Sequence, residues 1–326
     1  MSASNPPYFF QSTQSVDNRL GDMFGFVWAS YAGLRELWWQ VRGFRGQFPE
    51  LHIDQVKTKF FSGLPLPGGI DLARMCLNRE WGTHEQEFSK WILFEACTLY
   101  EGWAEKVCSD IFPPAQADRH AKNIQFPTGT NKAGNPTGFS LAIAAANAST
   151  SPLMVAEFLP VLKASKLNRW STAEEHLIAY RFFKECRNSF IHSDGVADQA
   201  LVDSRALLTA TQTGPSKPFR HMFVLPPLTV GAAIELNIKD CVLFATVVRL
   251  LICTFDAALS VSHASDAILE GRLRSIRTTN GAFANLPGDP AKREQRIKRL
   301  IAAARIPVPV NLANVIQWMA QKGIIR

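Results

Sequence analysis

Apolar residues recur along this chain at three- and four-residue steps, in long segments separated by short polar breaks. That spacing brings the apolar side chains onto one face of an α-helix, so each segment is expected to pack one side against a core. The pattern therefore indicates an all-α helical bundle. It predicts helices over residues 17–45, 84–108, 139–148, 152–165, 172–192, 238–263, 265–278, 290–304 and 311–322.

Three stretches in the second half of the chain have a more extended pattern. Residues 200–210 and 219–225 are separated by a Thr-Gly-Pro turn, and a short piece over residues 232–236 follows them. We expect a small β-hairpin or a three-stranded appendage here.

Two segments rich in proline and glycine are expected to be irregular. Residues 46–83 are broken by several prolines and a pair of glycines, which indicates a linker with short turns. Residues 126–139 contain Gly129-x-x-x-x-Gly134, the glycine spacing of a phosphate-binding loop, but Asn135 stands where that loop requires lysine. No strand signal precedes these glycines, so we interpret the segment as a surface loop.

The helix over residues 172–192 has signals at both ends. Ser171 and Glu174 have the Ser-x-x-Glu spacing of a capping box at its start. The pair Asp194-Gly195 offers a turn that ends the helix just beyond His192.

The sequence Arg187-Asn188-Ser189-Phe190-Ile191-His192, at the end of this helix, places a permanent cation, an amide and a titratable base close together. Arginine followed by four to six residues and then histidine occurs four times in the chain. Only this copy has an amide directly after the arginine, and only this copy ends a well-defined helix. It is therefore the candidate chemical motif.

Those three groups match the needs of RNA cleavage without a metal. The ribose 2′-hydroxyl attacks the adjacent phosphorus, so a base must take its proton and an acid must protonate the leaving 5′-oxygen. Histidine titrates near neutral pH and suits both steps, while the planar guanidinium of arginine binds phosphate bidentately. We assign His192 as general base or acid, Arg187 as the phosphate clamp and Asn188 as the residue that orients them.

The pattern Arg-Asn-x-x-x-His, late on a helix inside an all-helical domain, resembles the HEPN superfamily (higher eukaryotes and prokaryotes nucleotide-binding). Many of its members are metal-independent ribonucleases in toxin–antitoxin, abortive-infection and CRISPR-linked defence systems. The resemblance implies a HEPN-like domain over residues 84–264, with RNA as its substrate and an antitoxin or regulatory protein as a further partner. Residues 1–83 would then be an aromatic-rich helix and linker, and residues 265–326 a basic helical region.

The spacing within the motif bears on the oligomeric state. On an ideal helix, positions five apart lie about 140° apart around the axis, so Arg187 and His192 would face different ways. Either the helix loosens near His192 or a second chain completes the site. The resemblance favours the second option, because HEPN ribonucleases commonly pair two motifs across a dimer interface. A homodimer with a composite active site is therefore implied.

Positive charge is concentrated at the C-terminal end of the chain. The net charge is +7, and residues 270–326 hold eleven Lys and Arg against three Asp and Glu, a local balance of +8. Such a region indicates an anionic partner, most often nucleic acid, although an ordinary solvated helix face has the same composition. The candidate contacts are Lys292, Arg293, Arg296, Lys298 and Arg299.

Composition and cysteine usage indicate a folded cytoplasmic protein without a cofactor or metal. Apolar residues make up 47% of the chain and charged residues 19%, and residues 1–7 lack the basic and apolar parts of a secretory signal. The apolar run over residues 241–259 contains Arg249, which favours a buried core helix over a membrane span. None of the six cysteines forms a Cys-x-x-Cys pair, and no His-Glu-x-x-His arrangement is present.

Alternatives to catalysis stay open at this point. A histidine near the end of a helix stabilises it through the helix dipole by about 0.3–1 kcal/mol, so the motif also has a purely structural interpretation. A non-catalytic nucleic-acid-binding or adaptor protein, using the bundle for dimerisation, also fits the basic C-terminal region. A small-molecule enzyme is disfavoured, because no dinucleotide fingerprint or nucleophile elbow is found.

Overall fold

The computed structural model describes residues 6–61, 68–131, 133–283 and 285–325, and over these residues it is an all-α fold with one small β-hairpin. Part of the expected N-terminal segment (residues 1–5) and part of the expected linker (residues 62–67) lie outside the described residues. In chain order the elements are α1 (Gln11–Gln47), α2 (Ile53–Phe61), the π-helical turn η1 (Ala73–Asn78), α3 (Trp81–Ile111), α4 (Pro114–Asn123), β1 (Gly129–Thr130), β2 (Pro136–Thr137), α5 (Phe139–Asn147), the π-helical turn η2 (Met154–Phe158), α6 (Leu159–Lys163), the 3-10 turn η3 (Trp170–Thr172), α7 (Ala173–His192), α8 (Gln199–Thr213), α9 (Ile238–Leu259), α10 (Ala264–Thr279), the 3-10 turn η4 (Gly281–Phe283), α11 (Pro290–Ala303) and α12 (Leu312–Gln321).

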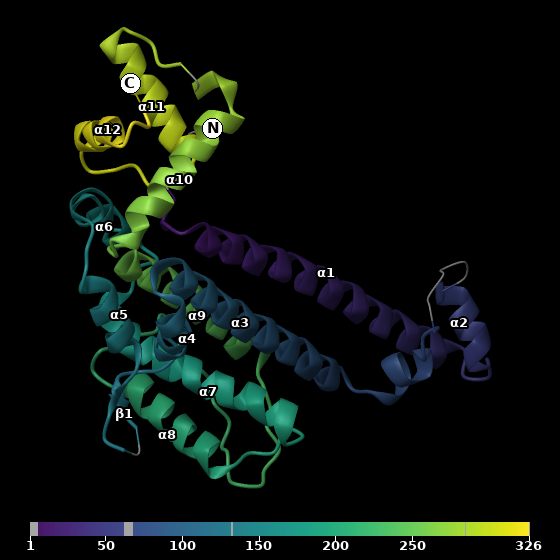
Figure 1. The fold of residues 1–326 in the computed structure, drawn as a ribbon. Helices are drawn as coiled ribbons and strands as arrows, with labels where there is room; N and C mark the ends of the chain where they lie inside the picture. Colours follow the sequence, from purple (N-terminus) through teal and green to yellow (C-terminus); the bar gives the residue numbers. More distant parts are fainter. Residues whose placement is uncertain (1–5, 62–67, 132, 284, 326) are drawn as a thin grey trace.

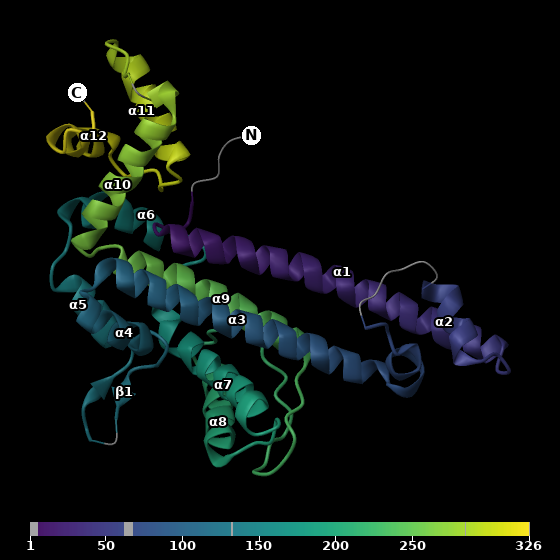
Figure 2. The same cartoon turned by 45° about the vertical axis from the view of Figure 1, so that its right-hand side comes forward.

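Helix α9 is the centre of the core. It packs along α3 on one side and against α7 on another, and α1 also contacts it (Figures 1 and 2). Within the described chain, it is the one helix long and apolar enough to cross a membrane, but 67% of its apolar window is buried inside the fold. The expectation of a buried core helix in this region is confirmed.

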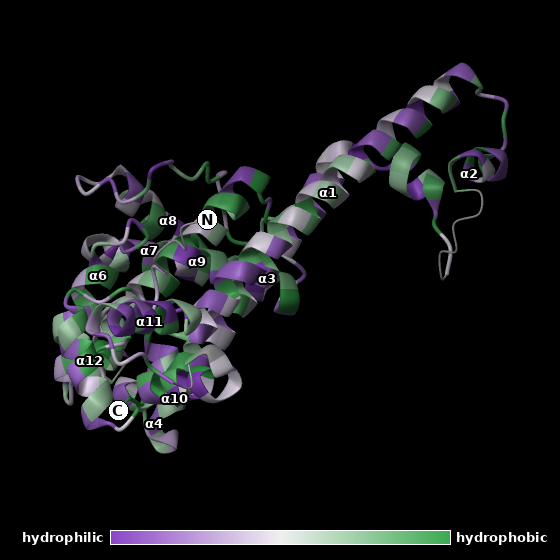
Figure 3. Cartoon of the chain, turned by 90° about the horizontal axis from the view of Figure 1, so that it is seen from above, coloured by the Kyte–Doolittle hydropathy of each residue, from purple (hydrophilic) through white to green (hydrophobic). Residues whose placement is uncertain are grey.

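Helix α1 belongs to two hydrophobic clusters. Its first half buries Val16, Leu20 and Val27 in the main core, against α3 and α9. Its second half extends beyond the body with α2 and η1 (Figures 1 and 3), where Trp38 and Val56 form a second cluster with their neighbours. The segment expected to be a linker therefore contains a helix and a π-helical turn that fold back onto α1.

The β-hairpin forms in a different place from the one expected. Strands β1 and β2 pair antiparallel within the segment interpreted as a surface loop, with Gly129 opposite Thr137. Residues 200–210, expected to be extended, are instead part of α8, because Asp198 caps its start by accepting a hydrogen bond from the Leu201 amide at 2.8 Å. Residues 219–225 form no strand, and the 232–236 piece has only an isolated bridge between Ala233 and Val196.

Helices α10, α11 and α12 form a layer at one end of the body (Figure 1). Glu157, buried on η2, joins α12 to the body: its carboxylate accepts hydrogen bonds from the Asn311 amide at 2.6 Å and from the Asn314 side chain at 2.7 Å. Its own carbonyl accepts from the Val310 amide at 3.0 Å. One buried side chain thus bonds the start of the C-terminal helix to the body.

Candidate active site

The end of α7 is set by the turn that follows it. Asp194 and Gly195 have left-handed backbones, with φ of 50° and 74°. The amides of Ser193 and Gly195 both donate to the carbonyl of Ser189, at 2.8 and 3.1 Å. A side chain at Gly195 would lie 2.8 Å from the Phe190 ring, so glycine is required there for space as well as for backbone conformation. The expected helix stop beyond His192 is confirmed.

The start of α7 differs from the expected capping box. Ser171 lies inside the 3-10 turn η3, and the residue before the helix, Thr172, makes no side-chain capping bond. The Glu174 carboxylate accepts instead from the Thr128 amide at 2.8 Å, and so ties the hairpin segment to α7. The capping-box prediction is wrong because the 3-10 turn shifts Ser171 away from the first free amides of the helix.

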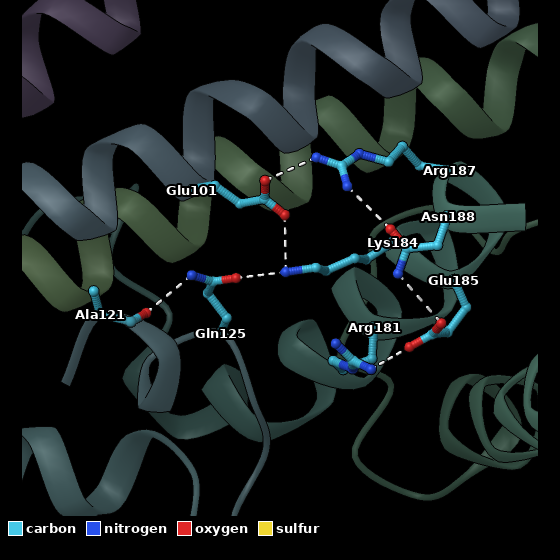
Figure 4. Close-up of polar contacts among 8 residues, drawn as sticks. All are labelled: Glu101, Ala121, Gln125, Arg181, Lys184, Glu185, Arg187 and Asn188. Atoms are coloured by element: carbon cyan, nitrogen blue, oxygen red, sulfur yellow. Dashed lines mark hydrogen bonds and ion pairs between the residues drawn. The ribbon is translucent and has the colours of Figure 1, made fainter. Parts of the chain in front are cut away.

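Arg187 is held against α3 by an ion pair. Its Nη2 lies 2.8 Å from Oε2 of Glu101, and Nζ of Lys184 lies 2.8 Å from the other carboxylate oxygen (Figure 4). Lys184 also donates to Oε1 of Gln125 at 2.6 Å. The side chains of Arg187 and Glu101 are 21% and 22% exposed. The pair therefore lies at the edge of the core, where salt screens its attraction less than that of a fully exposed pair.

Asn188 connects this ion pair to a second one. Its Oδ1 accepts from Nη1 of Arg187 at 3.0 Å, and its Nδ2 lies 3.4 Å from Oε2 of Glu185 (Figure 4). Glu185 in turn pairs with Arg181 one turn earlier. Arg187 and Asn188, which the sequence singled out, are therefore brought together by a direct hydrogen bond.

His192 lies apart from Arg187. Its side chain is exposed, and among the described residues no hydrogen bond or ion pair to it is found. The α-helix continues without interruption through His192, so the helix does not loosen between the two residues. Asn188 precedes His192 by four residues and shares its face, whereas Arg187 is turned toward α3.

Glu101 and Lys184 are the parts of this site that sequence reasoning missed. Lys184 and Arg187 are three residues apart on one helix, a spacing that places both on the same face. This signal was present in the sequence. Glu101 is 86 residues away from Arg187. The available signal was its position: Glu101 lies three residues before the buried Ala104 on a core helix. A charged side chain at such a position usually has an oppositely charged partner.

Two groups at the end of α7 are available to a substrate: the remaining donors of Arg187 and the imidazole of His192. A guanidinium has five N–H donors, and the bonds to Glu101 and Asn188 engage two of the Arg187 donors. The His192 side chain is exposed and therefore accessible to a substrate. Over the residues that the structure describes, no group of three or more His, Cys, Asp or Glu could hold a metal ion, and the six cysteines are buried free thiols.

The basic residues of the C-terminal region lie on α11. Asp289 caps this helix by accepting from the Lys292 amide at 2.8 Å, as its position before Pro290 predicts. Ile297 and Leu300 are buried. The side chains of Lys292, Lys298 and Arg299 are exposed, and those of Arg293 and Arg296 are half-buried. Lys298 pairs with Glu294 at 2.7 Å.

The motif and the basic helix are not brought together in one chain. Helices α7 and α11 lie on opposite sides of the α3–α9 pair (Figures 1 and 2). Comparison of the chain with known protein families, with curated proteins and with solved structures finds no match.

Proposed function

We propose that the chain is a metal-independent RNA endonuclease of HEPN type, acting in the cytoplasm as a toxin or antiviral effector. The observation that carries the proposal is the end of α7, where an exposed imidazole at His192 follows Asn188 by one turn and Asn188 is bonded to Arg187. A base, an amide and a fixed cation within six residues are the groups that metal-free cleavage requires.

In the proposed reaction, the imidazole of His192 accepts the proton of a ribose 2′-hydroxyl. The oxygen then bonds to the adjacent phosphorus while the bond from phosphorus to the 5′-oxygen breaks. The leaving oxygen takes a proton from a second acid, and the product carries a 2′,3′-cyclic phosphate. Arg187 neutralises charge on the phosphoryl oxygens, and Glu101 restricts its guanidinium to one position.

The proposed enzyme is a homodimer. Within one uninterrupted helix, His192 and Arg187 face different ways, so a single copy does not present both to one phosphate. A second copy of α7 would bring the His192 imidazole of one chain to the Arg187 guanidinium of the other, and would also supply the second proton-transfer group.

The test is cleavage of total RNA and of tRNA in EDTA by the wild-type chain and by His192→Ala. His221→Ala is the matched control, because His221 is also exposed and lies on a loop outside the motif. We expect the wild type and the control to cut and to leave cyclic-phosphate ends, and His192→Ala to lose activity by about a hundredfold or more. Equal cutting by all three chains, or cutting that stops when metal is removed, contradicts the proposal.

A non-catalytic nucleic-acid-binding or adaptor protein is the second candidate. The observation that favours it is the Arg187–Glu101 pair, which gives Arg187 a role in joining α7 to α3 without any substrate. Under this function RNA binds through the basic face of α11, no RNA is cut, and His192→Ala leaves the binding affinity unchanged. Measuring binding and cleavage on the same preparations separates the two candidates.

A further inference from the structure

A cleft of about 450 Å³ lies where the start of α1 meets α10 and the segment after α11. Its walls carry the amide side chains of Gln14 and Asn18 and the hydroxyls of Ser15 and Ser275. Two arginines, Arg272 and Arg305, also line it, and no carboxylate does. The cleft is therefore rich in hydrogen-bond donors and positive in charge, and it is far in the chain from the α7 motif.

Arg305 contributes a cation with no counter-ion. Its side chain is exposed, and no carboxylate among the described residues pairs with it. Its backbone is left-handed, with φ of 53°, which is uncommon for a residue other than glycine, asparagine or aspartate. The chain thus places an unpaired guanidinium at the mouth of a donor-lined cleft in a backbone conformation that arginine does not favour.

Arg272 contributes a second cation from inside the fold. It is only 8% exposed, and its two terminal nitrogens donate to the carbonyls of Phe9, Ala304 and Arg305. Its Nε is buried and has no acceptor within the described chain. Burial lowers the pKa of Arg272 to about 10, so it remains charged at neutral pH. The Asp256 carboxylate, which bonds to the Phe9 amide, interacts with this charge, so the unpaired cation of the cleft is Arg305.

The start of α1 forms one wall of the cleft through Gln14, Ser15 and Asn18. The amides of Phe9 and Phe10 at this helix start already donate to the buried Asp256 carboxylate, so the helix end itself contributes no free charge. The side-chain amides and hydroxyls of the first turns, together with Arg305, are the donors that converge on the cleft.

We propose that this cleft binds a phosphate group. Phosphate has tetrahedral oxygens that accept hydrogen bonds from several directions, which suits side-chain amides, hydroxyls and guanidinium groups on three walls. The volume exceeds the needs of one phosphate, so a phosphate ester with an attached sugar also fits the cleft. This proposal is independent of the reaction assigned to His192.

Two sources share that chemistry, a free nucleotide and the backbone of an RNA strand. An RNA strand would also contact α11. Arg299 precedes the cleft residue Ala303 by four positions on this helix, so the two residues share a face. A strand held by the phosphate cleft would then continue along the basic side of α11.

Three substitutions test the site. Arg305→Asn removes the unpaired cation with a residue that tolerates a left-handed backbone. Gln14→Glu places a carboxylate in the cleft, yet an acid near the start of a helix maintains or raises helix stability. Lys217→Asn is the matched control, because Lys217 is exposed and left-handed (φ 42°) and lies outside the cleft.

Binding is measured by calorimetry with inorganic phosphate and a 5′-mononucleotide, and by fluorescence anisotropy with a short RNA. We expect Arg305→Asn and Gln14→Glu each to weaken binding about tenfold or more, with Lys217→Asn unchanged and the melting temperature of Gln14→Glu retained. Tighter binding of the RNA than of the mononucleotide identifies a strand as the source, and equal binding identifies the nucleotide. No saturable binding of any probe, or equal binding by Arg305→Asn and Lys217→Asn, overturns the proposal.

Discussion

Asp256 and Arg272 hold Phe9 from opposite sides. The Asp256 carboxylate accepts from the Phe9 amide at 2.5 Å and from the Phe10 amide at 2.9 Å, while Arg272 donates to the Phe9 carbonyl. Asp256 also accepts from the Thr13 hydroxyl at 2.7 Å. The start of α1 is thus fixed by a carboxylate from α9 and a guanidinium from α10, which ties the N-terminal helix to the C-terminal layer.

We expect Asp256→Asn to destabilise the fold by about 1–3 kcal/mol near pH 5. An asparagine has one acceptor oxygen where the carboxyl group has two, so the buried Phe10 amide would face an NH₂ group and lose its acceptor. Urea unfolding followed by circular dichroism measures the loss. Asp22→Asn on the exposed face of α1 is the control, with an expected change within about 0.5 kcal/mol. Equal midpoints for the two variants would show that the bonds to Phe9 and Phe10 contribute nothing.

The stability contribution of Asp256 should depend on pH. Burial raises its pKa to about 7, although the hydrogen bonds from Thr13, Phe9 and Phe10 and the charge of Arg272 act in the opposite direction. The unfolded value is about 3.9, so the folded protein holds the proton more tightly. The contribution is therefore fully present below about pH 4 and is lost as the pH rises through about 7.

The measurement is the difference in unfolding free energy between the wild type and Asp256→Asn, from about pH 5 to about pH 8. We expect this difference to shrink as the pH rises, because only the wild type loses the contribution. Burial lowers the pKa values of His120 and His176. Their contribution to stability therefore rises with pH, but it does so equally in the wild type and in the variant and cancels in the difference. A difference that is constant with pH would mean that Asp256 does not titrate in this range.

Gly195 should be more sensitive to substitution than Gly231, another left-handed glycine. Its φ is +74°, and an added Cβ would lie 2.8 Å from the Phe190 ring. Gly231 has a similar φ of +83° but nothing within 4 Å of the added atom. We expect Gly231→Ala to lower the free energy of unfolding by about 1 kcal/mol through backbone strain alone, and Gly195→Ala to lower it by clearly more. Similar unfolding midpoints for the two would show that Phe190 moves aside without penalty.

The sequence predicted the helical parts of this fold better than its capping and hairpin details. Helices α3, α7, α9 and α11 have strong three- and four-residue periodicity, and each is found near its expected position. Helix α8 was missed because residues 200–210 were expected to be extended, whereas the Asp198 cap and the buried Leu201 and Leu208 belong to a helix. This helix packs against α7.

The candidate site was predictable only in part, for a related reason. Arg187, Asn188 and His192 are close in sequence, so their pattern could be read directly. Glu101, which fixes Arg187, comes from another helix, and no local spacing links the two. The cleft beside Arg305 is built from α1, α10 and the segment after α11, so it exists only once the two ends of the chain meet through Arg272.

The basic face of α11 should determine the salt dependence of RNA binding. Replacing Lys292, Lys298 and Arg299 together with alanine removes three exposed cations. Each phosphate contact to a single strand contributes about −0.7 to the slope of log K against log salt concentration, because a bound cation releases condensed counter-ions. We therefore expect the triple variant to bind more weakly and with a slope shallower by up to about 2.

The control for this prediction is the alanine triple at Lys122, Lys163 and Lys166, which removes the same number of exposed charges from α4, α6 and the adjacent loop. It lowers the net charge equally, so any effect of overall charge on association appears in both variants. A shallower slope for the α11 variant alone places phosphate contacts on that helix. Equal slopes in the two variants would mean that α11 is an ordinary solvated face, and that the excess positive charge acts only through the long-range field of the protein.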